Sequence, residues 1–319
     1  MNISITNACN RRCKYCFQKD WYLSKDIREM PVESFRELIA WIGNKTHFNL
    51  LGGEPLLHSR LADLLQIVKI NNKQCTLITN LSAPIDHIER YYKDNTIMSM
   101  MINADYPAAQ KQLFLNNLET IFKNKVLCSI STTLLTDTAS QLQSLKRLLQ
   151  IREMYKDITG SYKHLAFRIS PYSPNGKAFK IHNFSNDLIN FIHDLRCSGE
   201  IGITMDCHLN RCELDHYTER MFQNVNIRIP RVCNECDCAF DILVDGSIIY
   251  CSSAREIKLD NWRDYPTLKD ARKALTQKYN EYMQHYNGCS NSCSLYNDCI
   301  HACAGKVNQY KDHVIQFYN

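Results

Sequence analysis

The feature that most constrains the fold is a regular alternation of strand-like and helix-like segments over the first 205 residues. Short apolar runs are followed by stretches whose apolar side chains recur at helical spacing, as in 32–42. Units of about 30 residues are typical of parallel strands joined by crossover helices. We therefore predict an α/β fold with strands at 2–6, 47–51, 74–79, 96–103, 126–133, 164–170 and 201–205, and helices at 32–42, 60–70, 85–92, 110–122, 139–154 and 186–195.

The length of this region indicates an incomplete barrel. An eight-fold (β/α) barrel typically needs about 250 residues, and the alternating region ends near residue 205. We expect a partial (β/α)6 TIM-like barrel, whose chemistry should gather at the C-terminal ends of the strands. Polar or glycine-bearing segments do follow the predicted strands, at 9–16, 52–55, 79–80, 103–105, 132–133 and 170–176.

Cysteines are grouped rather than scattered. Of the 16 in 319 residues, three lie within 9–16 and eight within 233–303. The N-terminus lacks a signal-peptide pattern and no apolar run reaches membrane-spanning length, so we expect a cytoplasmic protein without a membrane segment. Cysteines in that compartment favour metal binding or redox chemistry over disulfides. A net charge of +5 is too small to indicate nucleic-acid binding.

The N-terminal cysteines form a C-x3-C-x2-C pattern, Cys9, Cys13 and Cys16, directly after the first strand. Three thiolates can hold three irons of a cubane cluster and leave the fourth iron with an open position. That iron can bind the amino and carboxylate groups of an amino-acid-like ligand and pass it an electron. A three-cysteine zinc site and chance clustering are the other interpretations.

A glycine-rich segment, Gly52-Gly53-Glu54-Pro55, follows the second strand. Glycines let the backbone approach a ligand closely, and Glu54 can accept charge-assisted hydrogen bonds from an ammonium group. The alternative is a tight turn in which Pro55 begins a helix.

Together the cysteine triplet with its aromatic residue before Cys16 and the GGEP segment resemble the radical S-adenosylmethionine (radical SAM) enzymes. The resemblance implies a 4Fe–4S cluster at Cys9, Cys13 and Cys16, with S-adenosylmethionine bound beside it. The positions that the resemblance assigns to S-adenosylmethionine are Tyr15, Gly52, Gly53, Glu54, Pro55, Asn80, Ser129, Thr132 and Arg168.

A second cysteine group surrounds a hairpin signal at Asp245-Gly246. Its members are Cys233, Cys236, Cys238, Cys251, Cys289, Cys293, Cys299 and Cys303. Eight thiolates suffice for two four-cysteine sites, which can hold iron–sulfur clusters or zinc.

This region resembles the SPASM extension of radical SAM enzymes, which carries auxiliary 4Fe–4S clusters. The resemblance implies one cluster at Cys233, Cys238, Cys251 and Cys303, and a second at Cys289, Cys293 and Cys299. Cys236 or Asp298 could complete the second set, so one or two auxiliary clusters are expected. The implied domains are the barrel (1–205), a bridging region (206–232) and a small cysteine-rich SPASM-like domain with a β-hairpin (233–319).

The function implied by the resemblance is that of a peptide maturase. Reductive cleavage of S-adenosylmethionine gives a 5′-deoxyadenosyl radical, which abstracts hydrogen from a residue of a ribosomally made peptide and leads to a crosslink or an epimerisation. The alternatives are oxidation of a small molecule or of a protein Ser or Cys and, outside the enzymes, an iron–sulfur electron carrier or scaffold.

Partners follow from this reading. A flavodoxin- or ferredoxin-type electron donor is expected beside the peptide. Because eight residues precede Cys9, we expect no N-terminal peptide-recognition domain. A peptide would then need a separate recognition protein, or would bind the barrel mouth and the SPASM surface directly.

Asp206 and Cys207, at the end of the last predicted strand, are the candidate catalytic pair. A thiol facing the radical site could return a hydrogen atom to the opposite face of a Cα radical, as an epimerase requires. The alternatives are that Cys207 packs in the core or binds metal together with Cys212.

Overall fold

The computed structural model describes residues 1–16, 26–135, 138–171, 201–205, 240–251 and 254–284. The chain divides into two compact units. One comprises Met1–Ser129 with Cys238–Asn280, and the other Ile130–Asp237 with Glu281–Asn319. Two segments far apart in the chain thus share the first unit. The three domains expected from the sequence remain a prediction.

The first unit is built on four parallel strands with helices between them. The strands pair in chain order. They are β1 (Asn2–Thr6), β2 (His47–Gly52), β3 (Gln74–Thr79) and β4 (Ile97–Asn103). The helices are α2 (Val32–Trp41), α3 (Leu61–Ile70), α4 (Glu89–Lys93) and α5 (Lys111–Lys123), with 3-10 turns η1 (Pro55–Leu57), η2 (Asp86–Ile88) and η3 (Ala108–Gln110).

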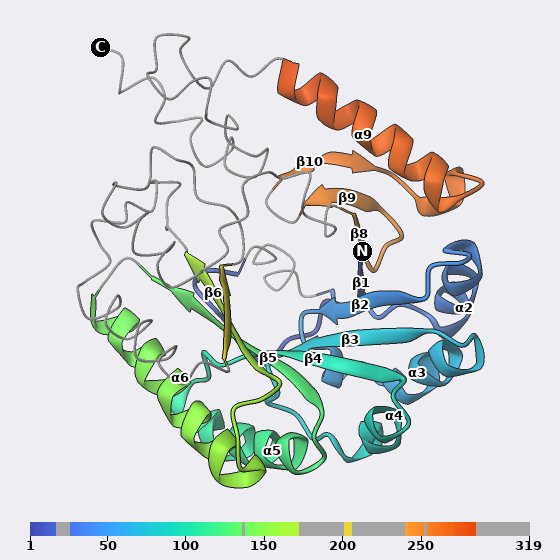
Figure 1. The fold of residues 1–319 in the computed structure, drawn as a ribbon. Helices are drawn as coiled ribbons and strands as arrows, with labels where there is room; N and C mark the ends of the chain where they lie inside the picture. The colour runs from blue at the N-terminus through green and yellow to red at the C-terminus, as the bar shows by residue number, and fades with distance from the viewer. Residues whose placement is uncertain (17–25, 136–137, 172–200, 206–239, 252–253, 285–319) are drawn as a thin grey trace, which may run out of the picture. The chain divides into compact units, whose positions relative to one another are not determined.

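The two faces of these strands differ in polarity because successive side chains point to opposite sides of a sheet. One face carries fully buried apolar residues such as Ile3, Leu50 and Leu77. Helices α2, α3 and α4 lie on one side of the strands (Figure 1), and α2 contributes the buried Phe35. The opposite face includes half-buried polar residues of β2, β3 and β4, among them Thr76. The helix-covered face is therefore the hydrophobic core of this unit.

The predicted hairpin extends the same sheet. Strands β8 (Asp241–Ile242) and β9 (Ile248–Cys251) pair antiparallel around Gly246, which has φ +86°. Strand β8 pairs in parallel with β1, and the Asn2 side chain donates to the Asp241 carboxylate at 2.6 Å. Strand β10 (Ala254–Leu259) continues the edge, which gives this unit the order β10-β9-β8-β1-β2-β3-β4 (Figure 1).

The segment after β10 contacts helix α2. Trp262 begins η8 (Trp262–Asp264), and its indole lies 5.4 Å from that of Trp41 between ring centroids. The Trp41 Nε1–H group donates to the Tyr265 carbonyl oxygen at 2.8 Å. Helix α9 (Leu268–Gln284) follows and buries Leu275. An aromatic contact and a hydrogen bond therefore join the segment after β10 to helix α2.

The second unit contains helix α6 (Thr138–Thr159) and the parallel strands β6 (Leu165–Pro171) and β7 (Gly202–Met205). Strand β5 (Leu127–Leu134) belongs partly to each unit.

The predicted α/β fold class with parallel strands is confirmed, and the arrangement is that of a partial TIM-like barrel. Each of the seven predicted strands begins and ends within one residue of the observed one. The helix predicted at 85–92 is instead a 3-10 turn followed by the short α4, and the one predicted at 186–195 lies outside the described residues. Strand β10 and helix α9 were not predicted. No helix of the described part is long and apolar enough to cross a bilayer.

Candidate functional site

The cysteine loop begins directly after β1. Cys9, Cys13 and Cys16 are half-buried and are not in disulfides among the described residues. Burial raises the pKa of the Cys9 thiol to about 11 and also raises the pKa of Cys13. Metal binding at this loop must therefore displace thiol protons, because the thiolate is the ligand form.

The donor set of this loop suits an iron–sulfur cluster. In the part of the chain that the structure describes, no three Cys, His, Asp or Glu side chains surround one point as a single-ion site requires. A 4Fe–4S cluster binds each thiolate through a different iron, so this arrangement is compatible with it. The Arg11 backbone N–H also donates to the Cys9 sulfur at 3.4 Å, the kind of contact that helps to orient a metal ligand.

Glu54 lies at the end of β2 and is completely buried. Its Oε1 accepts from the Leu56 backbone N–H at 3.0 Å and from the Thr79 hydroxyl at 2.6 Å. Its Oε2 accepts from the Asn80 backbone N–H at 2.6 Å. Desolvation raises the pKa of the carboxyl, and these hydrogen bonds oppose the rise. A carboxylate can accept about four hydrogen bonds, so Glu54 retains acceptor capacity for one more donor.

Asn80 connects Glu54 to the cysteine loop. Its side-chain amide donates to the Asn10 side-chain oxygen at 2.9 Å and approaches the Cys9 sulfur at 3.9 Å. The same residue is bonded to Glu54 through its backbone N–H. The ends of β2 and β3 therefore meet the loop after β1, as parallel strands predict.

The two glycines before Glu54 let another part of the protein's own backbone approach closely. A Cβ at Gly52 would lie 2.2 Å from the Thr6 carbonyl oxygen, and one at Gly53 would lie 2.2 Å from that of Ala8. Gly53 N–H donates to Thr6 and Glu54 N–H to Ala8, at 2.8 and 2.7 Å. We expected these glycines to make room for a ligand, whereas the close approach seen is to the start of the cysteine loop. Pro55 begins η1, and Glu54 caps that turn.

Arg11, inside the cysteine loop, was not predicted as a site residue. Its guanidinium is buried and donates to the ends of two other strands. The acceptors are the Asn80 carbonyl oxygen at 2.6 Å, Ser82 Oγ at 2.5 Å, Asn103 O and Oδ1 at 3.2 and 3.3 Å, and Gln110 Oε1 at 3.0 Å. Burial lowers the pKa of this arginine. The position of Arg11 between two cysteines of the loop was the only sign of its role in the sequence. Because charged residues in a loop are usually solvated, this sign did not predict a buried side chain.

Tyr15 points toward the end of β4. Its hydroxyl donates to Asp105 Oδ2 at 2.7 Å and lies 3.3 Å from Asn103 Oδ1. Burial and the neighbouring Asp105 raise the pKa of the phenol. The loop is thus bonded to β4 through Tyr15 as well as through Arg11.

The remaining predicted cofactor residues lie on β5 and β6. Ser129 and Thr132 stand on opposite faces of β5 because they are three residues apart. The Ser129 hydroxyl is buried without a hydrogen-bond partner among the described residues, whereas Thr132 faces the core. Arg168 lies on β6, in register with Thr204 of β7.

Among the auxiliary cysteines, only Cys251 is described, half-buried at the end of β9. The other predicted residues of the C-terminal region lie outside the described residues, as does the catalytic pair. These are Asp206, Cys207, Cys233, Cys236, Cys238, Cys289, Cys293, Cys299 and Cys303. Their assignments remain predictions.

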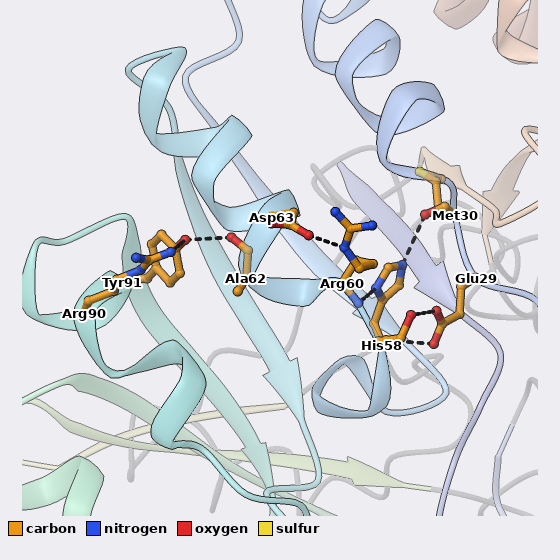
Figure 2. Close-up of polar contacts among 9 residues, drawn as sticks. Glu29, Met30, His58, Arg60, Ala62, Asp63, Arg90 and Tyr91 are labelled. Atoms are coloured by element: carbon orange, nitrogen blue, oxygen red, sulfur yellow. Dashed lines mark hydrogen bonds and ion pairs between the residues drawn. The ribbon is translucent and has the colours of Figure 1, made fainter.

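A cavity of about 600 Å³ lies elsewhere, between the start of α2 and α3, and none of the predicted site residues lines it. His58 is buried at this cavity, and Figure 2 shows its bonds. Its Nδ1 accepts from the Arg60 backbone N–H at 3.0 Å, so Nε2 carries the proton and donates to the Met30 carbonyl oxygen at 3.1 Å. Arg60 also pairs with Asp63. His58 and Arg60 therefore have hydrogen-bond partners within the protein at this cavity.

Comparison with known proteins bears on the site just described. Residues 3–149 match the model of the Radical SAM superfamily. This segment contains the cysteine loop, Glu54 and Asn80. The matched segment comprises 147 of the chain's 319 residues.

Curated relatives match shorter segments. The GTP 3',8-cyclase of Chlorobaculum tepidum is 34% identical over 71 residues, which are 22% of this chain and 21% of the relative. The GTP 3',8-cyclase of Clostridium perfringens strain 13 is 26% identical over 153 residues, 43% of this chain and 47% of the relative. An S-adenosylmethionine-dependent nucleotide dehydratase of Fibrobacter sp. is 30% identical over 90 residues, 25% and 26% of the two chains. The chain thus spans less than half the length of these relatives.

Solved structures of Streptococcus suis SuiB share the fold. SuiB bound to S-adenosylmethionine superposes with a TM-score of 0.56 at 12% identity, over 79% of this chain and 60% of SuiB. SuiB bound to the precursor peptide SuiA gives 0.55 at 14% identity, over 78% and 58%. At such identity the likeness concerns the fold alone. Residues 3–149, which carry the bonded cysteine loop, are thus similar to a radical SAM superfamily domain.

Proposed function

We propose that this chain is a radical SAM peptide maturase, which abstracts a hydrogen atom from a residue of a ribosomally made peptide. The observation that carries the proposal is the hydrogen-bonded junction of Cys9, Asn80 and Glu54. It joins Cys9, one of three potential iron ligands, to a buried carboxylate that retains acceptor capacity. A 4Fe–4S cluster with S-adenosylmethionine supplies, when bound, a 5′-deoxyadenosyl radical.

The chain's own groups have separate tasks in this proposal. Cys9, Cys13 and Cys16 hold the cluster and leave one iron open. Glu54, desolvated and already held by three donors, accepts one hydrogen bond from the methionine ammonium, which strengthens because water is excluded. Asn80 orients both groups. An electron carrier has no use for such an acceptor, which argues against the non-enzyme alternative.

The fold of SuiB, solved with a precursor peptide, supports a peptide substrate. We extend the proposal to a flavodoxin- or ferredoxin-type electron donor, to a separate recognition protein, and to auxiliary clusters at the C-terminal cysteines, of which Cys251 is described. The modification itself, a crosslink or an epimerisation assisted by Cys207, belongs to the same proposal.

A nucleotide or another small molecule is the second candidate substrate. The curated relatives, GTP 3',8-cyclases and a nucleotide dehydratase, favour it. Their matched segments cover about a fifth to half of each relative, so they bear on the shared radical SAM domain more than on the substrate. We therefore rank the peptide first.

The test begins with anaerobic reconstitution of the full chain with iron and sulfide. Reduced protein with S-adenosylmethionine should form 5′-deoxyadenosine, and the Cys13→Ala variant should not. Wild-type protein that binds zinc instead of iron at this loop, or a Cys13→Ala variant that still forms 5′-deoxyadenosine, would contradict the proposal.

Substrate class is decided by a second assay on the active protein. Candidate precursor peptides and GTP are supplied in parallel, and the products are read by mass. A peptide that loses two hydrogens indicates a crosslink, and one that gains a deuterium when the assay is run in D2O indicates epimerisation. Turnover of GTP with unchanged peptides would replace the peptide proposal by the nucleotide one. The Cys207→Ala variant should lose an epimerised product while still cleaving S-adenosylmethionine.

A further inference from the structure

Arg11 differs from the other arginine of the cysteine loop in how it is held. Its side chain is only 4% exposed, and its five N–H groups all have acceptors. The neighbouring Arg12 is exposed and donates to the carbonyl oxygens of Cys9 and Arg11, within the loop itself. Arg11 therefore provides a buried long-range link from the loop to other parts of the chain.

The acceptors of Arg11 belong to the ends of β3 and β4. One guanidinium nitrogen bonds Asn80 and Ser82 after β3, the second bonds Asn103 at the end of β4, and Nε bonds Gln110 in η3. A planar group with five fixed donors matches several acceptors at once, which a lysine cannot do. Arg11 thus fastens the loop between Cys9 and Cys13 to the strand that also bonds Glu54.

The positive charge of Arg11 affects the electrostatic environment of any group that the cysteines bind. Arginine stays protonated in proteins, and a charge removed from water acts more strongly on its neighbours. Arg11 lies between Cys9 and Cys13 in sequence, and Cys13 and Glu54 are among the groups that interact with it electrostatically. A reduced cluster carries one more negative charge than an oxidised one, so a buried cation beside it favours reduction.

We propose that Arg11 is a positioning residue for the N-terminal iron–sulfur cluster: it holds the cysteine loop on the ends of β3 and β4, and its charge favours the reduced cluster. This inference rests on the proposed function, since it requires a cluster at the cysteine loop.

The experiment compares the reconstituted full-length wild type with Arg11→Gln, Arg11→Lys and, as a matched control, Arg12→Gln. Midpoint potentials are measured by redox titration followed by electron paramagnetic resonance, and iron retention by competition with a chelator. Arg11→Gln should have a more negative midpoint potential, whereas Arg11→Lys should stay near the wild type because it keeps the charge. Both should hold iron about 10-fold more weakly or worse, the usual effect of losing an outer-shell partner.

Arg12→Gln should change neither quantity. The proposal is overturned if Arg11→Gln keeps the wild-type potential and iron retention, or if Arg12→Gln shifts both as much. Should Arg11→Gln fail to fold, Arg11→Lys decides, since wild-type iron retention in that variant contradicts the positioning role. If the wild-type protein binds no 4Fe–4S cluster, the proposed function itself is refuted. If the wild type binds the cluster and the Arg11 variants behave like it, only the role of Arg11 is refuted.

Discussion

At the scale of single residues, Glu54 shows how a buried charge is accommodated. Removing a carboxylate from water costs several kcal/mol unless hydrogen bonds replace the lost hydration, as a rough general figure. Two backbone N–H groups and one hydroxyl replace it here. Because the N–H groups belong to Leu56 after β2 and Asn80 after β3, the carboxylate also holds two strand ends together. Glu54 is therefore structural in this protein whatever it binds.

Glu54→Gln tests that conclusion. The amide nitrogen of glutamine must face one of the present donors, so a buried N–H or O–H loses its acceptor, at about 1–3 kcal/mol. We expect the free energy of unfolding of the metal-free protein to fall by about that amount in urea titrations. Binding of S-adenosylmethionine by the reconstituted protein, measured by calorimetry, should weaken about tenfold or more, since a charge-assisted bond is lost. The exposed Glu33→Gln serves as the control, and equal effects in both variants would contradict the prediction.

His58 predicts a pH effect on stability. Desolvation lowers its pKa below the ordinary 6.5, and neutral Nδ1 accepts a backbone N–H. When folding lowers the pKa of a base, its contribution to stability is complete at pH values above its unfolded pKa of about 6.5. The contribution is lost as the pH falls through the lower pKa of the folded state. His58→Gln should therefore remove part of the fall in unfolding free energy between neutral and acidic pH. Parallel curves for the two proteins across that range would show that His58 does not contribute.

At the scale of elements, the junction of β1 and β2 depends on the absence of a side chain. Gly53→Ala places a Cβ 2.2 Å from the Ala8 carbonyl oxygen, a backbone atom that no rotamer change can move. The hydrogen bonds from Gly53 to Thr6 and from Glu54 to Ala8 should break. We expect a loss of about 2 kcal/mol or more, the scale of two such bonds and the clash, and poor cluster assembly.

Gly202→Ala in β7 is the matched control for this substitution. Its Cβ would lie 3.8 Å from the Ala166 Cβ, an ordinary contact, so stability should change by about 0.5 kcal/mol or less. Both variants are compared by urea unfolding and by iron content after reconstitution. A Gly53→Ala protein as stable and as rich in iron as Gly202→Ala would contradict the expected clash.

At the scale of the whole molecule, residues 240–280 belong with the first four strands rather than apart from them. Trp262 is buried against Trp41, and its backbone N–H donates to the Gly246 carbonyl oxygen. Strand β8 supplies a neighbour for β1, which would otherwise be a sheet edge, with unpaired backbone groups. The C-terminal hairpin therefore completes the sheet on which the cysteine loop is built.

Trp262→Ala should consequently destabilise the unit as a whole, by about 3–5 kcal/mol for a buried tryptophan. Circular dichroism and hydrogen exchange of the β1–β4 amides should report the same shifted transition. Arg263→Gln, which removes an exposed ion pair with Glu37, should cost at most about 1 kcal/mol. If the amides of β1–β4 keep their wild-type protection in Trp262→Ala, residues 240–280 unfold separately, as the domain boundaries expected from the sequence imply.

The sequence predicted the strands closely because each is short, apolar and bounded by turn residues, which are local properties. It also located the cysteine loop, Glu54 and the hairpin at Asp245-Gly246. Strand β10 and helix α9 were missed because charged and polar residues interrupt their apolar positions. The role of Arg11 escaped for a different reason. Nothing in a run of polar loop residues tells which side chain will be buried.

By itself, then, the sequence determined the order of strands and helices, the hairpin and the spacing of the candidate iron ligands, because periodicity, turn chemistry and motif spacing act over a few residues. Only the tertiary structure decided that Gly53 meets Ala8, that Arg11 bonds the ends of β3 and β4, and that β8 pairs with β1. These contacts join positions far apart in the chain. They depend on strand order and register, which local patterns do not encode.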